Sequence, residues 1–304
     1  MGRGRAGRVR IAVGAVLLGT LGTVEARAQA PEGLLISAEE MAQGVRADNA
    51  VILHVGPAES YDAEHVAGAR PLTHRDVVRQ PSADAAGQEL RTELPEPRAL
   101  EATLEDLGIS DDSEIYVYWS EEWVSPTTRV VYTLQWAGLG DRVHVLNGGL
   151  PAWKEAGFST TDEPVPQGKG SVTVHPRPDL VVDAAWIQAH GAEPGVRIVD
   201  ARNAANYSGE EEDRGLAGHI PGAVNATFPQ FLDDQVRFRS SEELAGLFAE
   251  AGVMPGETVV AYCHLGQLAT AVMFAARLAG HDVKLYDGSW EDWAERGLPA
   301  AREN

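Results

Sequence analysis

The sequence predicts two tandem α/β domains, each built on a parallel β-sheet that is flanked by helices on both faces. The 304 residues are enough for about two domains of ~150 residues. The same order of motifs occurs twice, roughly 140–155 residues apart. Within each copy, short apolar runs alternate with helical stretches. Runs that lack polar alternation are typical of parallel strands that are buried on both faces.

Four pairs of segments define the two copies. They are 51–53 with 196–199, 65–69 with 219–223, 115–118 with 258–261, and 145–149 with 285–289. Helix starts are expected at the capping boxes of Ser37 and Ser240, each of which has Glu three residues later, and at Asp183. The predicted domains span 31–161 and 179–304. The segment 162–178, rich in proline and glycine at its start, is expected to link them.

The composition is that of a folded, acidic protein. Apolar residues make up 44% and charged residues 23%, as in ordinary globular chains. The formal net charge is −20. Nucleic acids and anionic lipids bind basic surfaces, so neither is expected as a partner. A small anionic ligand held by local dipoles is still compatible with this charge.

The first 30 residues are expected to be a cleavable secretory signal. Four arginines in residues 3–10 precede the mostly apolar stretch 11–24, and residues 28–30 (AQA) match a cleavage site. A membrane anchor is the alternative, but a bilayer span needs ~20 apolar residues and this stretch is shorter. We therefore expect a periplasmic or secreted protein that has no membrane association after cleavage.

The only cysteine, Cys263, lies where chemistry is expected. It follows a predicted buried strand and precedes a helix expected from about Leu268 to Gly280, at the sheet edge where open α/β sheets bind ligands. Gly266 permits a tight turn, and the helix N-terminus supplies unpaired N–H groups and partial positive charge. Such surroundings lower the pKa of a thiol and favour its use as a nucleophile. The alternative is a buried, inert cysteine.

The first copy has no thiol at the matching position. The apolar runs align Ser120 with Cys263, and Glu121 and Glu122 follow it, where their charges would repel an anion. We therefore expect the first domain to be non-catalytic. A single cysteine also excludes an intramolecular disulfide and a multi-cysteine metal site.

Several motifs resemble those of the tandem-domain rhodaneses, the thiosulfate sulfurtransferase family, over roughly residues 33–300. The segments concerned are 200–202 (DAR) with Tyr207, 218–223 (GHIPGA), 286–290 (YDGSW) and 145–149 (VLNGG). Each is weak alone, but together and in order they identify the chain as similar to an exported bacterial-type member of that family. The resemblance implies two rhodanese-like domains, of which only the second is catalytic.

The resemblance also implies a reaction. The Cys263 thiolate attacks the outer sulfur of thiosulfate and releases sulfite, which leaves a persulfide. A thiol or cyanide acceptor then removes that sulfur, with ping-pong kinetics. The persulfide would be held by the amides of the loop residues, which are His264, Leu265, Gly266, Gln267 and Leu268. No metal or organic cofactor is implied, and a monomer is expected.

Arg202 is the candidate for binding the negative end of the donor. It follows a buried strand at the same sheet edge as Cys263, although it could instead pair with the acidic run 210–213. Asp200 is expected to brace the loop through hydrogen bonds to the backbone. His219 has a counterpart, His65, in the copy without a thiol, so a shared structural role is expected. Arg129 is a candidate for the cleft between the domains.

The loop after Cys263 differs from both family patterns, C-R-K-G-V-T and C-G-S-G-V-T, so a 3-mercaptopyruvate donor remains an alternative. His264 could supply positive charge there if protonated. Trp290 and Trp293 are expected in the core.

Two other functions remain as alternatives to sulfur transfer. A cysteine phosphatase needs C-x5-R, but Ala269 occupies that position, and Arg277 is ~21 Å along an ideal helix. A persulfide carrier without turnover would load sulfur but discharge it slowly.

Overall fold

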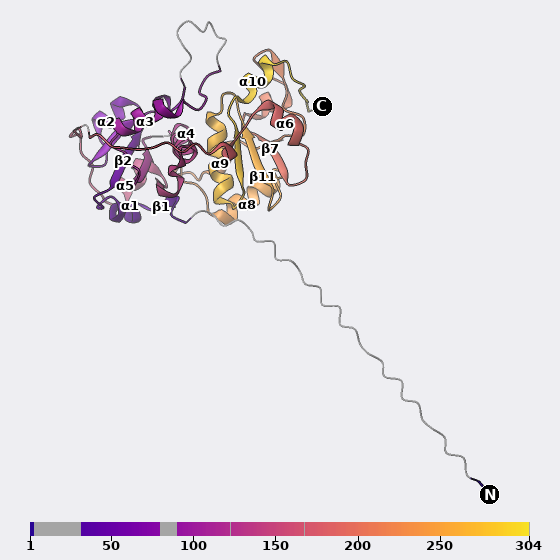
Figure 1. Cartoon of the computed structure of the whole chain (residues 1–304), viewed down its shortest axis with the longest axis horizontal. Coiled ribbons are helices and arrows are strands. Elements are labelled where there is room, and N and C mark those ends of the chain that lie inside the picture. Colours follow the sequence, from indigo (N-terminus) through magenta and orange to yellow (C-terminus); the bar gives the residue numbers. More distant parts are fainter. Residues whose placement is uncertain (3–31, 80–89, 122, 167, 304) are drawn as a thin grey trace.

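The computed structural model describes residues 1–2, 32–79, 90–121, 123–166 and 168–303. The two domains lie side by side, and helices α4 and α9 lie between their sheets (Figure 1). The predicted fold class is confirmed: each domain has a five-stranded, fully parallel sheet flanked by helices. The expected signal, residues 1–30, lies almost wholly outside the described residues. Within the described part of the chain, no helix combines the length and apolar character needed to cross a bilayer.

The first sheet has the strand order β1-β5-β4-β2-β3. Its strands are β1 (Leu35–Ile36), β2 (Ala50–Val55), β3 (Ala69–Leu72), β4 (Glu114–Trp119) and β5 (Val143–Leu146). Its helices are α1 (Ala38–Gly44), α2 (Ala58–Ala63), α3 (Pro97–Asp106), α4 (Val124–Leu134) and α5 (Gly149–Glu155). A π-helical turn, Gln135–Leu139, follows α4 directly and contains Gly138 at φ +89°.

The second sheet has the equivalent order β10-β7-β11-β12-β6. Its strands are β6 (Val181–Val182), β7 (Val196–Asp200), β10 (Val224–Asn225), β11 (Thr258–Tyr262) and β12 (Val283–Tyr286), and the small hairpin β8 (Glu212–Asp213) with β9 (Leu216–Ala217) stands apart. The helices are α6 (Ala184–His190), α7 (Ala204–Ser208), α8 (Ser241–Glu250), α9 (Gln267–Leu278) and α10 (Ser289–Glu295).

Alternating strand side chains build cores on opposite faces of each sheet. In β2, Leu53 faces the central core that includes α3 and α4, whereas Ile52 faces an outer core with α1 and α5. The second domain repeats this arrangement with α8 and α9 on the inner face and α6 and α10 on the outer face. The central core is continuous between the domains, because α4 packs against α9.

The helix N-caps that were predicted from the sequence are confirmed. Ser37 with Glu40 and Ser240 with Glu243 form complete capping boxes, and the Asp183 carboxylate accepts a hydrogen bond from the Trp186 N–H at 2.7 Å. The predicted linker segment runs along the first domain: the N–H groups of His175 and Arg177 donate to carbonyls of the π-helical turn at 2.9 and 2.8 Å.

The expected equivalence of Ser120 and Cys263 is wrong by one residue. The hydroxyls of Tyr118 and Tyr262 make the same contact. Each accepts a hydrogen bond at 3.0 Å from the backbone N–H of the residue after the equivalent histidine, Val66 after His65 and Ile220 after His219. Trp119, fully buried, is therefore the counterpart of Cys263, and Ser120 corresponds to His264. Apolar runs alone do not fix the alignment of the two copies, whereas the matching hydrogen bonds of the two buried hydroxyls do.

Candidate active site

Cys263 follows β11 directly and is 1% exposed. The N–H groups of Leu265, Gly266, Leu268 and Ala269 donate hydrogen bonds toward its sulfur. They come from the turn and the first residues of α9. Leu265, Gly266 and Leu268 belong to the predicted set, whereas the N–H groups of His264 and Gln267 are not among those that act on the sulfur. Ala269 was missing from the predicted set.

The predicted lowering of the thiol pKa is not what the structure shows. Burial raises the pKa of Cys263, and the hydrogen bonds from the four N–H groups act in the opposite direction without cancelling it. Cys263 is almost fully buried and belongs to the central core together with Ala261 and Ala269, so burial outweighs the hydrogen bonds.

The backbone of Cys263 is fixed from the YDGSW segment. The Cys263 N–H donates to Ser289 Oγ at 3.2 Å, and the Cys263 carbonyl accepts from the Trp290 N–H at 3.0 Å. Ser289 has φ +54°, an unusual value for a residue with a side chain. Its hydroxyl in turn donates to the Tyr286 carbonyl at 2.9 Å. The reactive residue therefore rests on the start of α10 as well as on its own strand.

Gly266 is required by close packing. It has φ +82° and serves as the N-cap residue of α9. A Cβ there would lie 2.8 Å from the Asp287 carbonyl and 3.2 Å from Arg129 Nη1. The left-handed turn predicted from the sequence thus lets the loop lie directly on the end of β12.

Arg129 reaches this loop from the first domain, as the sequence analysis suggested. Its side chain is fully buried, and Nη1 donates to Asp287 Oδ1 at 2.6 Å, with the Gly266 carbonyl at 3.5 Å. The short segment 91–94 adds further contacts: Leu94 N–H donates to Asp287 Oδ2 at 2.6 Å, and Thr92 Oγ1 donates to the Leu265 carbonyl. Both domains therefore support the loop.

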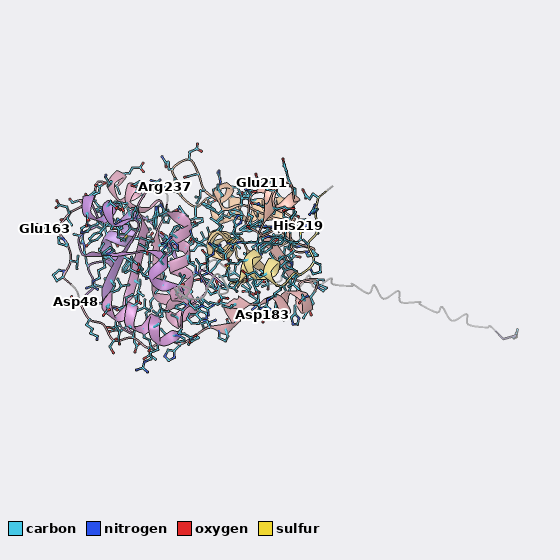
Figure 2. The ribbon with its side chains drawn as sticks, turned by 90° about the horizontal axis from the view of Figure 1, so that it is seen from above. Asp48, Glu163, Asp183, Glu211, His219 and Arg237 are labelled. Atoms are coloured by element: carbon cyan, nitrogen blue, oxygen red, sulfur yellow. The ribbon has the colours of Figure 1, made fainter. Side chains whose placement is uncertain are left out.

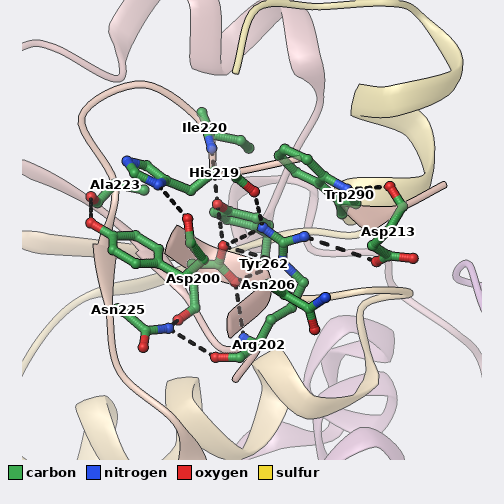
Figure 3. A network of polar contacts seen from close by, with 12 residues as sticks. Asp200, Arg202, Asn206, Asp213, His219, Ile220, Ala223, Asn225, Tyr262 and Trp290 are labelled. Carbon is green, nitrogen blue, oxygen red and sulfur yellow. Dashed lines mark hydrogen bonds and ion pairs between the residues drawn. The ribbon is translucent and has the colours of Figure 1, made fainter. Parts of the chain in front are cut away.

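Arg202 is fully buried beside Asp200 (Figure 3). Nη2 donates to Asp200 Oδ2 and to the Gly218 carbonyl, both at 2.7 Å, and Nε donates to the Asp200 carboxylate. The Trp290 ring covers the guanidinium with its centroid 4.0 Å from Cζ. From the acidic run, it is Asp213 that approaches, with Oδ2 3.9 Å from Nη1. Its predicted role in donor binding stays a prediction.

Asp200 was expected to brace the loop, but its carboxylate contacts Arg202 and Tyr262 and none of residues 264–268. Its Oδ1 accepts from the Arg202 N–H at 2.9 Å, and its Oδ2 accepts from the Tyr262 hydroxyl at 2.6 Å. The remaining loop residues differ in what they contact. His264 Nδ1 lies 2.6 Å from Asp213 Oδ2, Gln267 Nε2 donates to Ser125 Oγ of the first domain at 3.3 Å, and Leu268 packs on the central core.

His219 has the structural role that its counterpart implied. The ring stacks on Tyr207 with centroids 3.9 Å apart, and Nδ1 lies 2.8 Å from the Tyr207 carbonyl. His65 does the same with Tyr61 at 3.8 and 2.7 Å. Trp290 and Trp293 are core residues, as predicted. In the part of the chain that the structure describes, no group of three or more His, Cys, Asp or Glu side chains could hold a metal ion.

Sequence reasoning missed Asp287, Ser289 and Thr92 as neighbours of the cysteine loop. The first two lie within the YDGSW segment, so their position next to a recognised motif was a usable signal. Thr92, with φ +62°, belongs to the first domain, and no sequence pattern joins it to a loop 173 residues away.

The comparisons with known proteins agree with this architecture. The model of the rhodanese-like domain matches twice, at residues 37–156 and 183–296. A probable 3-mercaptopyruvate sulfurtransferase from Pseudomonas aeruginosa is 36% identical over 78% of this chain and 83% of its own length. A putative thiosulfate sulfurtransferase from Mycobacterium tuberculosis is 33% identical over 88% of this chain and 95% of its own length.

Solved structures match over nearly the whole chain. An anaerobic ergothioneine biosynthesis enzyme from Chlorobium limicola superposes with a TM-score of 0.75 at 22% identity, over 90% of this chain and 71% of that one. At this identity the likeness shows the fold alone. The fold match and the two domain matches rest on separate evidence and define the same two units.

Proposed function

Because this chain belongs to the rhodanese family, we propose that it is a sulfurtransferase that carries a sulfane sulfur as a persulfide on Cys263. One observation carries the proposal: the sulfur of Cys263 lies at the carboxyl end of β11 and receives hydrogen bonds from the N–H groups of four residues. Such a ring stabilises negative charge on sulfur, which both the thiolate and the terminal sulfur of a persulfide bear.

The reaction proceeds in two half-reactions. In the first, the Cys263 thiolate attacks the sulfane sulfur of the donor, a new S–S bond forms, and the old bond breaks with its electron pair on the leaving group. With thiosulfate the leaving group is sulfite. In the second, an acceptor thiolate or cyanide attacks the outer persulfide sulfur, and Cys263 departs as thiolate. The enclosed site keeps water from the persulfide between the two steps.

Thiosulfate is the proposed donor, and 3-mercaptopyruvate is the alternative. Both kinds of sulfurtransferase occur among the relatives. The two donors share a negative charge, which the amide ring and Arg202 would attract. A comparison of kcat/KM on the two donors, with cyanide as acceptor, distinguishes them.

The test of the proposed function is intact-protein mass spectrometry after incubation with thiosulfate. We expect the mass of one sulfur atom to be added and then removed by cyanide, and we expect Cys263→Ser to fold normally and gain nothing. Sulfur transfer at the wild-type rate by Cys263→Ser would contradict the proposal. A single loading event without steady-state turnover would instead identify a persulfide carrier.

We also propose that the protein is exported. The support is the order of basic, apolar and small residues within 1–30. Expression of the full chain in a Gram-negative host should give a periplasmic product whose mass lacks those 30 residues. A cytosolic product that retains them would contradict export.

A further inference from the structure

The second domain places one of its own carboxylates, that of Asp213, against the side chains of His264 and Arg202. Asp213 Oδ2 lies 2.6 Å from His264 Nδ1 and 3.9 Å from Arg202 Nη1. His264 directly follows the reactive cysteine in the loop. Trp290, whose ring lies on Arg202, donates its backbone N–H to the Cys263 carbonyl. Asp213 therefore contacts the residue that follows Cys263, and it approaches an arginine that is covered by a residue bonded to the Cys263 backbone.

Arg202 has one hydrogen-bond donor that the described residues do not satisfy. Nε and Nη2 are occupied by Asp200 and Gly218, but Nη1 is buried and has no hydrogen-bond partner within the described part of the chain. A separation of 3.9 Å is an ion-pair contact and too long for a hydrogen bond. A buried charged donor without a partner is costly, so this nitrogen is suited to an anion that approaches more closely than Asp213 does.

The backbone of Asp213 is fixed, whereas its side chain can move. Asp213 ends the first strand of the β8–β9 hairpin, whose turn residues Arg214 and Gly215 have φ +59° and +72°. Its carbonyl accepts a hydrogen bond from Trp290 Nε1 at 3.0 Å. The side chain remains 18% exposed, so the carboxylate has a path to solvent by rotation about its own bonds. Neighbouring Glu211, by contrast, lies on the outside of the domain (Figure 2).

We propose that Asp213 occupies the subsite for the negative end of the sulfur donor, and that the donor must displace its carboxylate from His264 and Arg202. This inference rests on the proposed function and assigns Asp213 the role of a specificity-determining residue. An anionic donor replaces one negative charge with another and completes the hydrogen bonding of Nη1. A neutral sulfur compound cannot do this and would leave the Asp213 contacts in place.

The experiment compares Asp213→Asn with Glu212→Gln, in the Cys263→Ser background, by calorimetric titration with thiosulfate. Both substitutions remove one negative charge from adjacent positions, but Glu212 is exposed and makes none of these contacts. Asn retains an acceptor for His264, which protects the fold; thermal melts check this. We expect Asp213→Asn to bind thiosulfate about fivefold or more tightly, with Glu212→Gln unchanged.

Equal affinity in the Asp213→Asn variant and its parent would overturn the inference, as would an equal gain in both variants, which would show a general charge effect. Persulfide loading of the chain that retains Cys263, read by mass, tests the proposed function separately. Loading together with an unchanged affinity overturns the inference alone. Tighter binding without loading supports the subsite and contradicts the function. No binding and no loading contradict both.

Discussion

At the scale of single residues, small differences in size and charge determine what the site can do. The sequence pointed to Cys263 and Gly266, because a cysteine between a strand and a glycine turn is visible in a one-dimensional pattern, and to Asp200 and Arg202 through the DAR motif. It did not predict the ion pair between those two side chains. It gave the wrong direction for the thiol pKa. Desolvation depends on how completely the folded chain encloses the sulfur, and no local pattern carries that information.

Gly266→Ala is expected to distort the loop after Cys263. Alanine at φ +82° is strained, and its Cβ would lie 2.8 Å from the Asp287 carbonyl. We expect a loss of about 1–3 kcal/mol in the free energy of unfolding and a larger proportional loss of kcat, because the amides that face the sulfur would shift. Urea denaturation and steady-state assays measure the two effects. Gly246→Ala, within α8 and with open space around its Cβ, is the matched control and should retain full activity.

Arg202→Met is expected to destabilise the fold by about 3–5 kcal/mol, because it leaves the fully buried Asp200 charge without its partner. Arg197→Met on the same strand breaks the more exposed pair with Glu257 and should cost at most about 1 kcal/mol. Adding Asp200→Asn to Arg202→Met should recover part of the loss in a chemical denaturation series. If Arg202→Met unfolds no more easily than Arg197→Met, the buried pair is not a structural one.

At the scale of elements, the two sheets carry different polar networks at the same place. Strand register pairs His54 with Tyr118 in the first domain and Asp200 with Tyr262 in the second. Where the second domain has an ionic network, the first domain has a row of hydrogen bonds between uncharged groups. His54 Nε2 lies 3.0 Å from Ser60 Oγ, which lies 2.9 Å from Ser120 Oγ. The sequence predicted the parallel sheets, the capping boxes and the helix after Cys263. It aligned the first copy with the second one residue out of step at Cys263, because the alignment is fixed by hydrogen bonds of tyrosine hydroxyls that can be seen only in the folded structure.

The first-domain network makes stability depend on pH. Burial, with a smaller contribution from His65, lowers the pKa of His54 to about 4 from its ordinary 6.5. Because the folded pKa lies below the unfolded one, the stabilisation is complete above pH 6.5 and is lost as the pH falls from 6.5 toward 4. It amounts to about 3 kcal/mol at most.

Urea denaturation between pH 7 and pH 4 measures this dependence. His54→Gln, which does not titrate, should show a shallower loss of stability over that window than the wild type. Parallel curves for the two proteins would contradict the assignment to His54. His190→Gln is the control, since this histidine is on the surface of α6 and should leave the wild-type slope intact.

At the scale of the whole molecule, the first domain contributes contacts to the cysteine loop of the second. The duplication was predicted from repeated motifs, and the inactivity of the first copy, inferred from its missing thiol, stays a prediction. The contacts of Arg129 and of segment 91–94 with the cysteine loop and the YDGSW segment were beyond prediction in detail, because they join residues from 137 to 200 positions apart. The packing of α4 against α9 joins the two domains, and further contacts, such as the hydrogen bond from Asn147 Nδ2 to the Phe238 carbonyl, add to it.

Arg129→Met is expected to reduce activity although Arg129 belongs to the first domain. Its removal leaves Asp287 buried without a cation beneath Gly266, so the loop should lose order and kcat should fall at least about tenfold. Arg98→Met, exposed on α3, is the control and should behave as wild type. Activity assays with thermal melts distinguish a local effect from unfolding; full activity in Arg129→Met would show that the loop does not depend on the interface.

The buried indole of Trp119 makes it difficult to place a reactive cysteine at the equivalent position of the first domain. It fills the place that the thiol has in the other sheet, and Gly149 leaves room for it where the second half has Ser289: a Cβ at Gly149 would lie 2.5 Å from the indole Cδ1. A lone Trp119→Cys exchange would open a void worth about 3–5 kcal/mol. A second sulfur-carrying cysteine in the first domain would therefore need several substitutions at once. The single substitution Trp119→Cys would lower the stability of the fold without creating a working site.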